Sequence, residues 1–361
     1  MADYLNVYYV AIGGSDTLNN GLTPGAAFAS IIKAQSVAVT GDLIMVGPGT
    51  FAPNLVNSYF SGVDVIGSGI DSTYFIESGE LGVTGPVWPV GNNHMLSDVT
   101  IQCDLTADAV RMPIGFDSTL METNGLALPT GFVGKRIKII GNSDGIYMDA
   151  AATTTTVGAI WRWYDCQIIC KYDCVRLFDA NLTNEFHNCN ILTDALAGDP
   201  ALSPTNSFNK GLITRAIHAQ KGNVKVVGGR LHALNTCANS TQTTPIYAHN
   251  QVKAKLIGVR LDGGATGTGA AAYLDAQLAR VGTPEGSETA TMQLIGCTRI
   301  GTLGGSNVAN IVDNATPTVT SPAGVIPAAA DVKSGVPTGS TVGTLAASSG
   351  GGSGVIGSVV G

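Results

Sequence analysis

Short runs of alternating apolar and polar residues recur along the chain, and most of them end at a Gly, Cys or Asn. Alternation with a period of two is typical of β-strands that bury one face in a core. The runs occupy residues 43–47, 63–67, 99–103, 137–141, 166–170, 189–192, 224–231, 254–261 and 292–297. Ile168 and Ile191 hold equivalent positions 23 residues apart, and the runs at 224–231 and 254–261 are nearly alike at an offset of 30.

This spacing predicts an all-β fold, a parallel β-helix in which each coil takes roughly 20 to 30 residues. Strands this short cannot bury a face alone, whereas stacked coils bury a continuous apolar column. A β-sandwich also contains many short strands, but its turns come about every 8 to 12 residues. Longer stretches at 195–210, 236–246 and 262–290 then read as insertions on the outside of the solenoid.

Helical periodicity is confined to residues 26–39. The residues that would share one face of this helix are Phe28, Ile31, Ile32 and Gln35. A helix across the open end of the solenoid would prevent end-to-end addition of strands. We therefore expect three parts: an N-terminal strand, capping helix and first coil in 1–50, the β-helix in 51–305, and an extended Gly/Ser/Ala/Val-rich tail in 306–361.

Composition narrows the class of protein. The 361 residues include 47 Gly and only 12% charged residues, about half the usual fraction of charge. The 44% of apolar residues excludes global disorder, and the absence of helical heptads excludes a coiled coil. The formal net charge of −7, with Lys and Arg spread thinly, predicts no binding of nucleic acid. No apolar run is long enough to predict a membrane span.

The N-terminal residues lack a basic segment followed by a long apolar one, which predicts no secretory signal. None of the seven cysteines forms a Cys-x-x-Cys pair, so we expect reduced thiols and assembly in a cytosol. The densest group of cysteines could bind a zinc ion, or its thiols could be buried side by side in the apolar core. We expect buried thiols. The members of this group are Cys166, Cys170, Cys174 and Cys189, with His187 nearby.

The first 50 residues resemble the entry segment of pectin-lyase-like right-handed parallel β-helix proteins. The matching segments are 8–10, 14–16, 20–24, 28–32, 41–46 and the corner Gly47-Pro48-Gly49-Thr50-Phe51. The resemblance implies an opening strand, a capping helix, a first coil and right-handed winding. It is specific for fold and not for function, because this fold carries lyases, hydrolases, adhesins and viral spikes.

One segment, Asn142-Ser143-Asp144-Gly145-Ile146, resembles the first motif of the polygalacturonases. Tyr172-Asp173 departs from the paired aspartates of their second motif, and no Gly-His-Gly occurs. The resemblance implies carboxylates on adjacent coils, for which the candidates are Asp144, Asp173, Asp179 and Glu185. The same Asn-x-Asp-Gly sequence forms ordinary turns, which we favour. We therefore assign no catalytic, cofactor-binding or metal-binding residue, and no cofactor.

Trp161 and Trp163 belong to the only dense aromatic cluster, and alternation places both on one face with Arg162 on the other. On an outer sheet they would form a subunit interface or a sugar-stacking platform. We expect the interface.

The last residues contain a phrase, 328–345, that resembles the C-terminal part of phage virion surface proteins. The leading hypothesis is a non-enzymatic structural protein of a phage particle, located on the virion as a head decoration, vertex spike or tailspike-like component. The expected partners are two further copies in a homotrimer, other virion proteins contacted through residues 306–361, and a host surface polysaccharide. The alternative is a polysaccharide-degrading β-helix enzyme, and a non-viral adhesin is disfavoured by the absence of an export signal.

Overall fold

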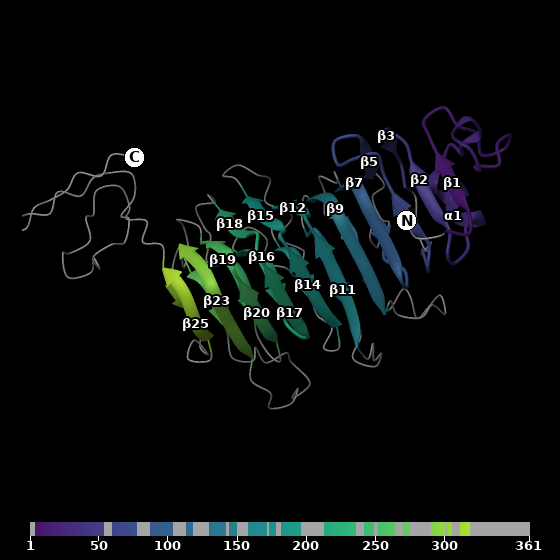
Figure 1. Ribbon diagram of the computed structural model, residues 1–361. Helices are drawn as coiled ribbons and strands as arrows, with labels where there is room; N and C mark the ends of the chain where they lie inside the picture. The colour runs from purple at the N-terminus through teal and green to yellow at the C-terminus, as the bar shows by residue number, and fades with distance from the viewer. Residues whose placement is uncertain are drawn as a thin grey trace, which may run out of the picture. The chain divides into compact units, whose positions relative to one another are not determined.

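The chain is seen in a computed structural model (Figure 1). The structure describes residues 4–53, 60–77, 87–103, 113–117, 130–141, 144–149, 158–171, 173–177, 182–195, 213–235, 242–248, 252–263, 270–274, 290–300, 302–304 and 311–317. Within these ranges the strands form two sheets, one of 17 strands and one of 8.

The larger sheet collects two strands from most coils. Its strands are β1 (Val7–Val10), β2 (Leu43–Val46), β3 (Gly49–Phe51), β4 (Asp64–Ile66), β5 (Thr73–Glu77), β7 (His94–Cys103), β9 (Gly131–Gly141), β11 (Ala159–Tyr164), β12 (Gln167–Cys170), β14 (Leu182–His187), β15 (Asn190–Ala195), β17 (Asn223–Val227), β18 (Arg230–Asn235), β20 (Lys253–Ile257), β21 (Arg260–Asp262), β23 (Thr291–Ile300) and β25 (Ile311–Pro317).

The smaller sheet collects one strand from each of eight coils. Its strands are β6 (Trp88–Pro89), β8 (Ile114–Asp117), β10 (Ile146–Asp149), β13 (Asp173–Leu177), β16 (Ile213–Ala219), β19 (Gln242–Ala248), β22 (Ala270–Leu274) and β24 (Thr302–Gly304).

The strand pairings confirm the parallel β-helix. Every described pairing is parallel and joins a strand to its equivalent in a neighbouring coil. Val224 lies opposite Ala254, at the predicted offset of 30, and Ile168 lies opposite Ile191. Successive coils therefore place residues of the same kind beside one another, and the strands follow one another along the solenoid (Figure 1).

In many coils the part of the chain that belongs to the larger sheet bends at a residue with positive φ, either between two strands or within one long strand such as β7, β9 or β23. Seven successive coils place such a residue at the same point, with φ between 47° and 65°: Asp98, Arg136, Asp165, Asn188, Gly228, Gly258 and Gly296. A single left-handed residue turns the chain sharply, and Gly, Asn and Asp adopt that conformation at least cost. Gly228 and Gly258, which lie within the two nearly alike runs of the sequence, both occupy such a bend.

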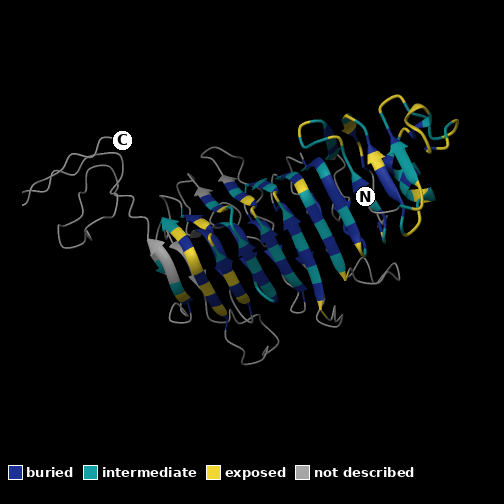
Figure 2. Ribbon diagram, in the orientation of Figure 1, coloured by how far each residue is buried: buried dark blue, intermediate teal, exposed yellow. Residues whose placement is uncertain are grey.

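The inside of the solenoid is mainly apolar, and Figure 2 shows buried residues along most of its strands. One column runs through five consecutive coils with each side chain opposite the next: Ile139, Ile168, Ile191, Leu231 and Leu261. All five are at most 1% exposed. Each apolar side chain in this column is covered by the side chains of the coils before and after it. A single short strand would leave the same side chain exposed to water, so the short strands are stable only as a stack.

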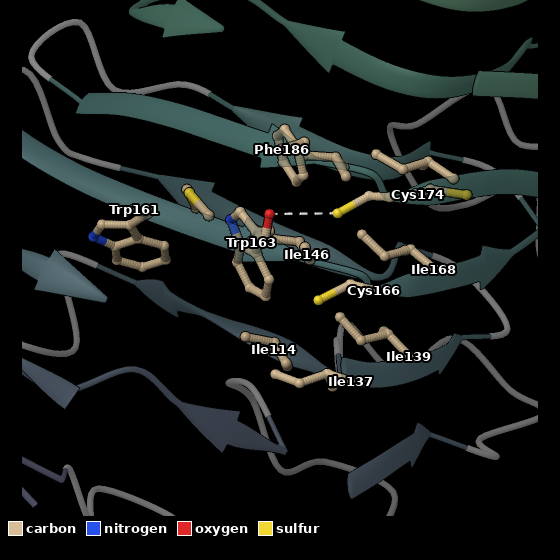
Figure 3. Packing of buried hydrophobic residues seen from close by; sticks show 14 of the residues in the cluster. Ile114, Ile137, Ile139, Ile146, Trp161, Trp163, Cys166, Ile168, Cys174 and Phe186 are labelled. Atoms are coloured by element: carbon tan, nitrogen blue, oxygen red, sulfur yellow. Dashed lines mark hydrogen bonds between the residues drawn. The ribbon is translucent and has the colours of Figure 1, made fainter. Parts of the chain in front are cut away.

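The tryptophan pair lies in this core, which corrects the prediction of an outer aromatic surface. Trp161 and Trp163 are fully buried and Arg162 points the other way, so the alternation was predicted correctly and the face was not. Trp163 packs against Phe132, with ring centroids 5.0 Å apart, and against Phe186, with ring centroids 6.0 Å apart. Figure 3 shows Trp163 and Phe186 side by side. Neither a subunit interface nor a sugar platform can use these two side chains.

Helix α1 (Ile31–Val37) is shorter than the predicted helical stretch, and a 3₁₀ turn at Pro24–Ala26 precedes it. Ser30 caps the helix, because its Oγ accepts a hydrogen bond from the Lys33 backbone N–H at 3.2 Å. Ile31 and Ala34 are the buried residues of the helix. That α1 caps the stack of coils stays a prediction.

Strand β25 pairs with β23 in parallel, so coil structure continues to Pro317, past the expected end of the β-helix at residue 305. The rest of the expected tail, residues 318–361, lies outside the described residues. In the described part of the chain, neither helical segment has the length and apolar composition that crossing a bilayer requires.

Candidate functional site

The smaller sheet brings together a group of charged side chains from three consecutive coils, and we call it the Asp173 cluster. Its members are Asp144, Asp173, Arg176, Arg215 and His218. Register explains the proximity, because Asp173 lies opposite Arg215 and Arg176 lies opposite His218 on the paired strands β13 and β16. The Gly145 N–H donates to the Asp173 carbonyl at 3.3 Å, which places the preceding Asp144 beside the same group.

Asp173 is held on both carboxylate oxygens. Arg215 donates from Nε to Oδ1 and from a terminal nitrogen to Oδ2, both at 2.7 Å. His218 Nδ1 lies 2.9 Å from Oδ2 and must carry the proton there, because an ionised carboxylate only accepts. A bidentate guanidinium pair of this kind fixes geometry as well as charge.

Asp144 has a weaker partner. Arg176 donates from a terminal nitrogen to its Oδ2 at 3.3 Å. The Arg176 guanidinium carbon also lies 5.4 Å from the ring centre of Tyr147, and the Arg215 guanidinium carbon lies 5.0 Å from that of Tyr247. Each arginine is therefore held between a carboxylate and an aromatic ring.

The surroundings of the two carboxyl groups shift their pKa values in opposite directions. Burial raises the pKa of Asp144 to about 6, against the opposing effect of the Arg176 charge. Burial alone would also raise the pKa of Asp173, but the charges of Arg215 and His218 outweigh it and hold the pKa well below its usual range. Near neutral pH Asp173 is ionised, whereas Asp144 gains its proton on mild acidification.

Two carboxyl groups with separated pKa values can act as an acid and a base. Access works against that chemistry, because the side chains of Asp173 and Asp144 are only 7% and 12% exposed and those of Arg176 and Arg215 only 10% and 13%. Each carboxylate also forms an ion pair with an arginine of the same chain, Asp144 with Arg176 and Asp173 with Arg215. The arrangement therefore acts as a polar clamp joining three coils.

Two of the four candidate carboxylates, Asp144 and Asp173, meet in this cluster. Glu185 lies on the other sheet, where it binds Arg162 at 3.1 Å and Lys225 at 3.2 Å. Asp179 lies outside the described residues. Sequence reasoning missed the three basic members of the cluster, because their proximity depends on the register between β13 and β16.

The buried-thiol prediction is confirmed for the cysteine group. Cys166, Cys170, Cys174 and Cys189 are all at most 1% exposed in the apolar core. Figure 3 shows Cys166 and Cys174 among the core side chains. The Sγ of Cys189 lies 3.5 Å from the Trp163 carbonyl oxygen, to which it donates. Among the described residues, no three His, Cys, Asp or Glu side chains come together in a way that would hold a metal ion.

Comparison with known proteins supports the fold. No protein-family model and no curated protein sequence matches the chain. Among solved structures it is similar to pectate lyase Pel9A, with a TM-score of 0.52 and 12% identity over 88% of this chain and 80% of the lyase. This likeness shows that the chain has the parallel β-helix fold found in a pectate lyase; at this identity it shows nothing of activity.

Two further solved structures align with the chain at lower scores. Pectin methylesterase from carrot gives a TM-score of 0.43 and 14% identity over 89% of this chain and 91% of the esterase. The product of ORF18 of Geobacillus virus E2 gives 0.41 and 13% identity, over 86% of this chain and 60% of the viral protein. Neither score is high enough to add to the argument.

Proposed function

We propose that the chain is a non-enzymatic structural protein of a bacteriophage particle. In this proposal it forms a homotrimeric β-helix on the virion surface, as a head decoration, vertex spike or tail component, and contacts the host surface. Residues 306–361, nearly uncharged and rich in Gly, Ser, Ala and Val, attach it to other virion proteins.

The observation that best supports a non-enzymatic role is that the acidic groups of the Asp173 cluster are buried and paired with basic groups. Asp173 uses both oxygens on Arg215 and His218, and Asp144 meets Arg176, so the best-placed acidic groups are bound to basic groups of the same chain. A glycosidase needs its two carboxyl groups free to flank one glycosidic bond, about 5 to 9.5 Å apart. Buried ion pairs between coils instead suit a rod that must keep its shape.

Assembly with other proteins is supported by the first part of the chain. Several large apolar side chains are exposed there: Leu5 at 71%, Ile12 at 62%, Leu18 at 88%, Leu22 at 47% and Val39 at 57%. Apolar groups that collect on one part of a surface mark protein contacts, because covering them removes apolar area from water. Within the proposal these residues contact either a second copy or another virion protein.

A polysaccharide-degrading β-helix enzyme is the second candidate. It is favoured by the separated pKa values of Asp144 and Asp173, which is the arrangement expected of an acid and its ionised partner. In that reading Asp144 donates a proton to the leaving oxygen and Asp173 acts as base or nucleophile.

Two experiments separate these functions. Mass spectrometry of purified phage particles, with antibody labelling in the electron microscope, should find the chain on the virion, and light scattering should give three times the mass of one chain. Absence from purified particles would overturn the structural proposal. The enzyme reading is tested by incubating the protein with host capsule, polygalacturonate and methylated pectin, and following reducing ends and released methanol. Sustained release that Asp173→Asn abolishes would establish the second candidate instead.

A further inference from the structure

Basic residues are concentrated in one part of the sequence, in contrast to the thin spread expected above. Residues 200–261 contain eight Lys or Arg and no Asp or Glu, in a chain whose formal net charge is −7. The rest of the chain is therefore more acidic than the total indicates. An uninterrupted basic stretch in an acidic protein concentrates positive potential on whichever surface displays it.

The fold displays five of these residues on the outside of the larger sheet, and we call them the basic face: Lys225, Arg230, Lys253, Lys255 and Arg260. Lys225 lies directly opposite Lys255 in the next coil, and Arg230 lies directly opposite Arg260. On β20, Lys253 and Lys255 alternate with the buried Ala254 and Leu256, so both point outward. Figure 2 shows the exposed bands on β20 and β23.

Only part of this charge is balanced by the chain itself. Asp262 is buried and accepts from Nε of both Arg230 and Arg260. Glu185 is shared between Lys225 and Arg162. Within the described residues, Lys253 and Lys255 have no carboxylate within ion-pair distance.

Stacking like charges directly opposite one another on paired strands is unfavourable. Coils in a parallel β-helix are about 4.8 Å apart, so these amino and guanidinium groups line up at short intervals along the solenoid. A linear polymer with repeated negative charges would meet several of them at once and relieve their mutual repulsion. Release of the polymer's counterions would add to the affinity.

We propose that the basic face binds a linear acidic polysaccharide. The outward residues beside the lysines are Asn223, Thr291 and Gln293, whose hydroxyl and amide groups hydrogen-bond sugar hydroxyls. Among the described outward positions of β17, β20 and β23 there is no aromatic side chain on which a nucleic-acid base would stack. The face therefore fits a carbohydrate better than a single-stranded nucleic acid.

A second copy of this chain fits the face less well. This step rests on the proposed homotrimer, in which a threefold axis along the solenoid places the same coil of each copy at the same height. The basic coils of one copy would then lie beside the basic coils of the next. The basic face is on a different sheet from the Asp173 cluster, so the two groups of charged side chains are separate sites.

The test uses the full chain, with polygalacturonate as the acidic probe, dextran as the neutral probe and a single-stranded DNA oligonucleotide as the competing polyanion. Binding is followed by biolayer interferometry between about 50 and 500 mM NaCl. We expect binding of polygalacturonate that weakens steeply with salt, with little binding of dextran. Equal binding of dextran and polygalacturonate, no binding at low salt, or tighter binding of DNA than of polygalacturonate would each overturn the proposal.

Variants locate the site. Lys253→Gln with Lys255→Gln should weaken binding of polygalacturonate by about tenfold or more. The matched control is Lys33→Gln with Lys135→Gln, which removes the same charge outside the basic face and should change the affinity by less than about twofold. Equal losses in the two double variants would show that only net charge acts and would overturn the assignment. Light scattering on the same samples reports the trimer separately, so failure of the homotrimer and failure of the basic face are distinguishable.

Discussion

Asp173 on β13 receives two hydrogen bonds of 2.7 Å from Arg215 on β16, across neighbouring coils of the smaller sheet. Both side chains are almost inaccessible to water, at 7% and 13% exposure. A pair in this situation is stabilised by its geometry, and removal of either partner leaves the other charge buried. Loss of this single ion pair should therefore destabilise both of the coils that it joins.

Arg215→Gln should lower the free energy of unfolding by about 3 to 5 kcal/mol, because it leaves the Asp173 carboxylate with His218 as its only remaining charged partner among these groups. Urea denaturation followed by circular dichroism measures the change. Arg162→Gln serves as the control, since Arg162 is 41% exposed and Glu185 keeps Lys225; its cost should stay below about 1 kcal/mol. Similar costs for the two variants would contradict the buried clamp.

Asp144 should make the protein less stable as pH rises from about 4 to about 7. Burial raises its pKa in the folded state to about 6, so the folded protein holds a proton that the unfolded chain releases near pH 4. Its stabilising contribution is complete below the unfolded pKa and is lost as pH rises through the folded pKa. Asp144→Asn should remove this trend, which is worth up to about 3 kcal/mol. Unfolding curves of wild type and variant, subtracted at each pH, give the result; a constant difference would show that Asp144 titrates normally.

His94 should have the opposite effect on stability from Asp144, because it should make the protein less stable as pH falls. It stacks on Phe60 and Trp88, accepts a hydrogen bond from Trp88 Nε1 at 3.2 Å, and its Nδ1 meets the Val63 carbonyl. Burial lowers its pKa to about 4, so its contribution to stability is present above the unfolded pKa of about 6.5 and is lost as pH falls through about 4. His94→Gln should reduce the acid sensitivity by about 3 kcal/mol across this window. Nuclear magnetic resonance titration of the His94 ring checks the cause, and an ordinary pKa would refute it.

Gly134→Ala should destabilise the apolar core around Trp163. A Cβ at this position would lie 2.7 Å from Trp163 Cε3 and 3.1 Å from Ile137 Cδ1, and both side chains are buried and unable to move away. Overpacking of this kind costs about 1 to 3 kcal/mol. Gly25→Ala is the control, because nothing lies within 4 Å of its Cβ, and its melting temperature should stay close to that of the wild type. A Gly134→Ala protein as stable as the control would show that the core around Trp163 is packed less tightly than described.

The cysteines should resist modification in the folded protein. Six of the seven are described and all six are buried, and burial raises the pKa of the Cys174 thiol well above its usual value. An aromatic disulfide reagent should therefore titrate at most one thiol before unfolding and all seven in denaturant. Rapid reaction of several thiols under native conditions would contradict the burial of the six described cysteines.

Part of the candidate site could be predicted from the sequence. Asp144 and Asp173 were identified as candidates, and their meeting on adjacent coils follows from the register of the small sheet. Arg176, Arg215 and His218 were not identified, because nothing in their spacing shows that insertions of different lengths bring them to one place. The basic face was also missed, although its sequence sign, a long stretch without a carboxylate, was available.

The sequence by itself determined the architecture: alternating short runs at coil spacing, matched as Ile168 with Ile191 and Val224 with Ala254, require stacked parallel strands because each run is too short to bury a face alone. Only the tertiary structure decided which face of each strand points inward. Alternation assigns Trp161 and Trp163 to one side but cannot say which, since both sides of a β-helix strand carry apolar residues somewhere along the chain. The same holds for charge, because strand pairing between coils, and not distance along the chain, sets which carboxylate meets which arginine.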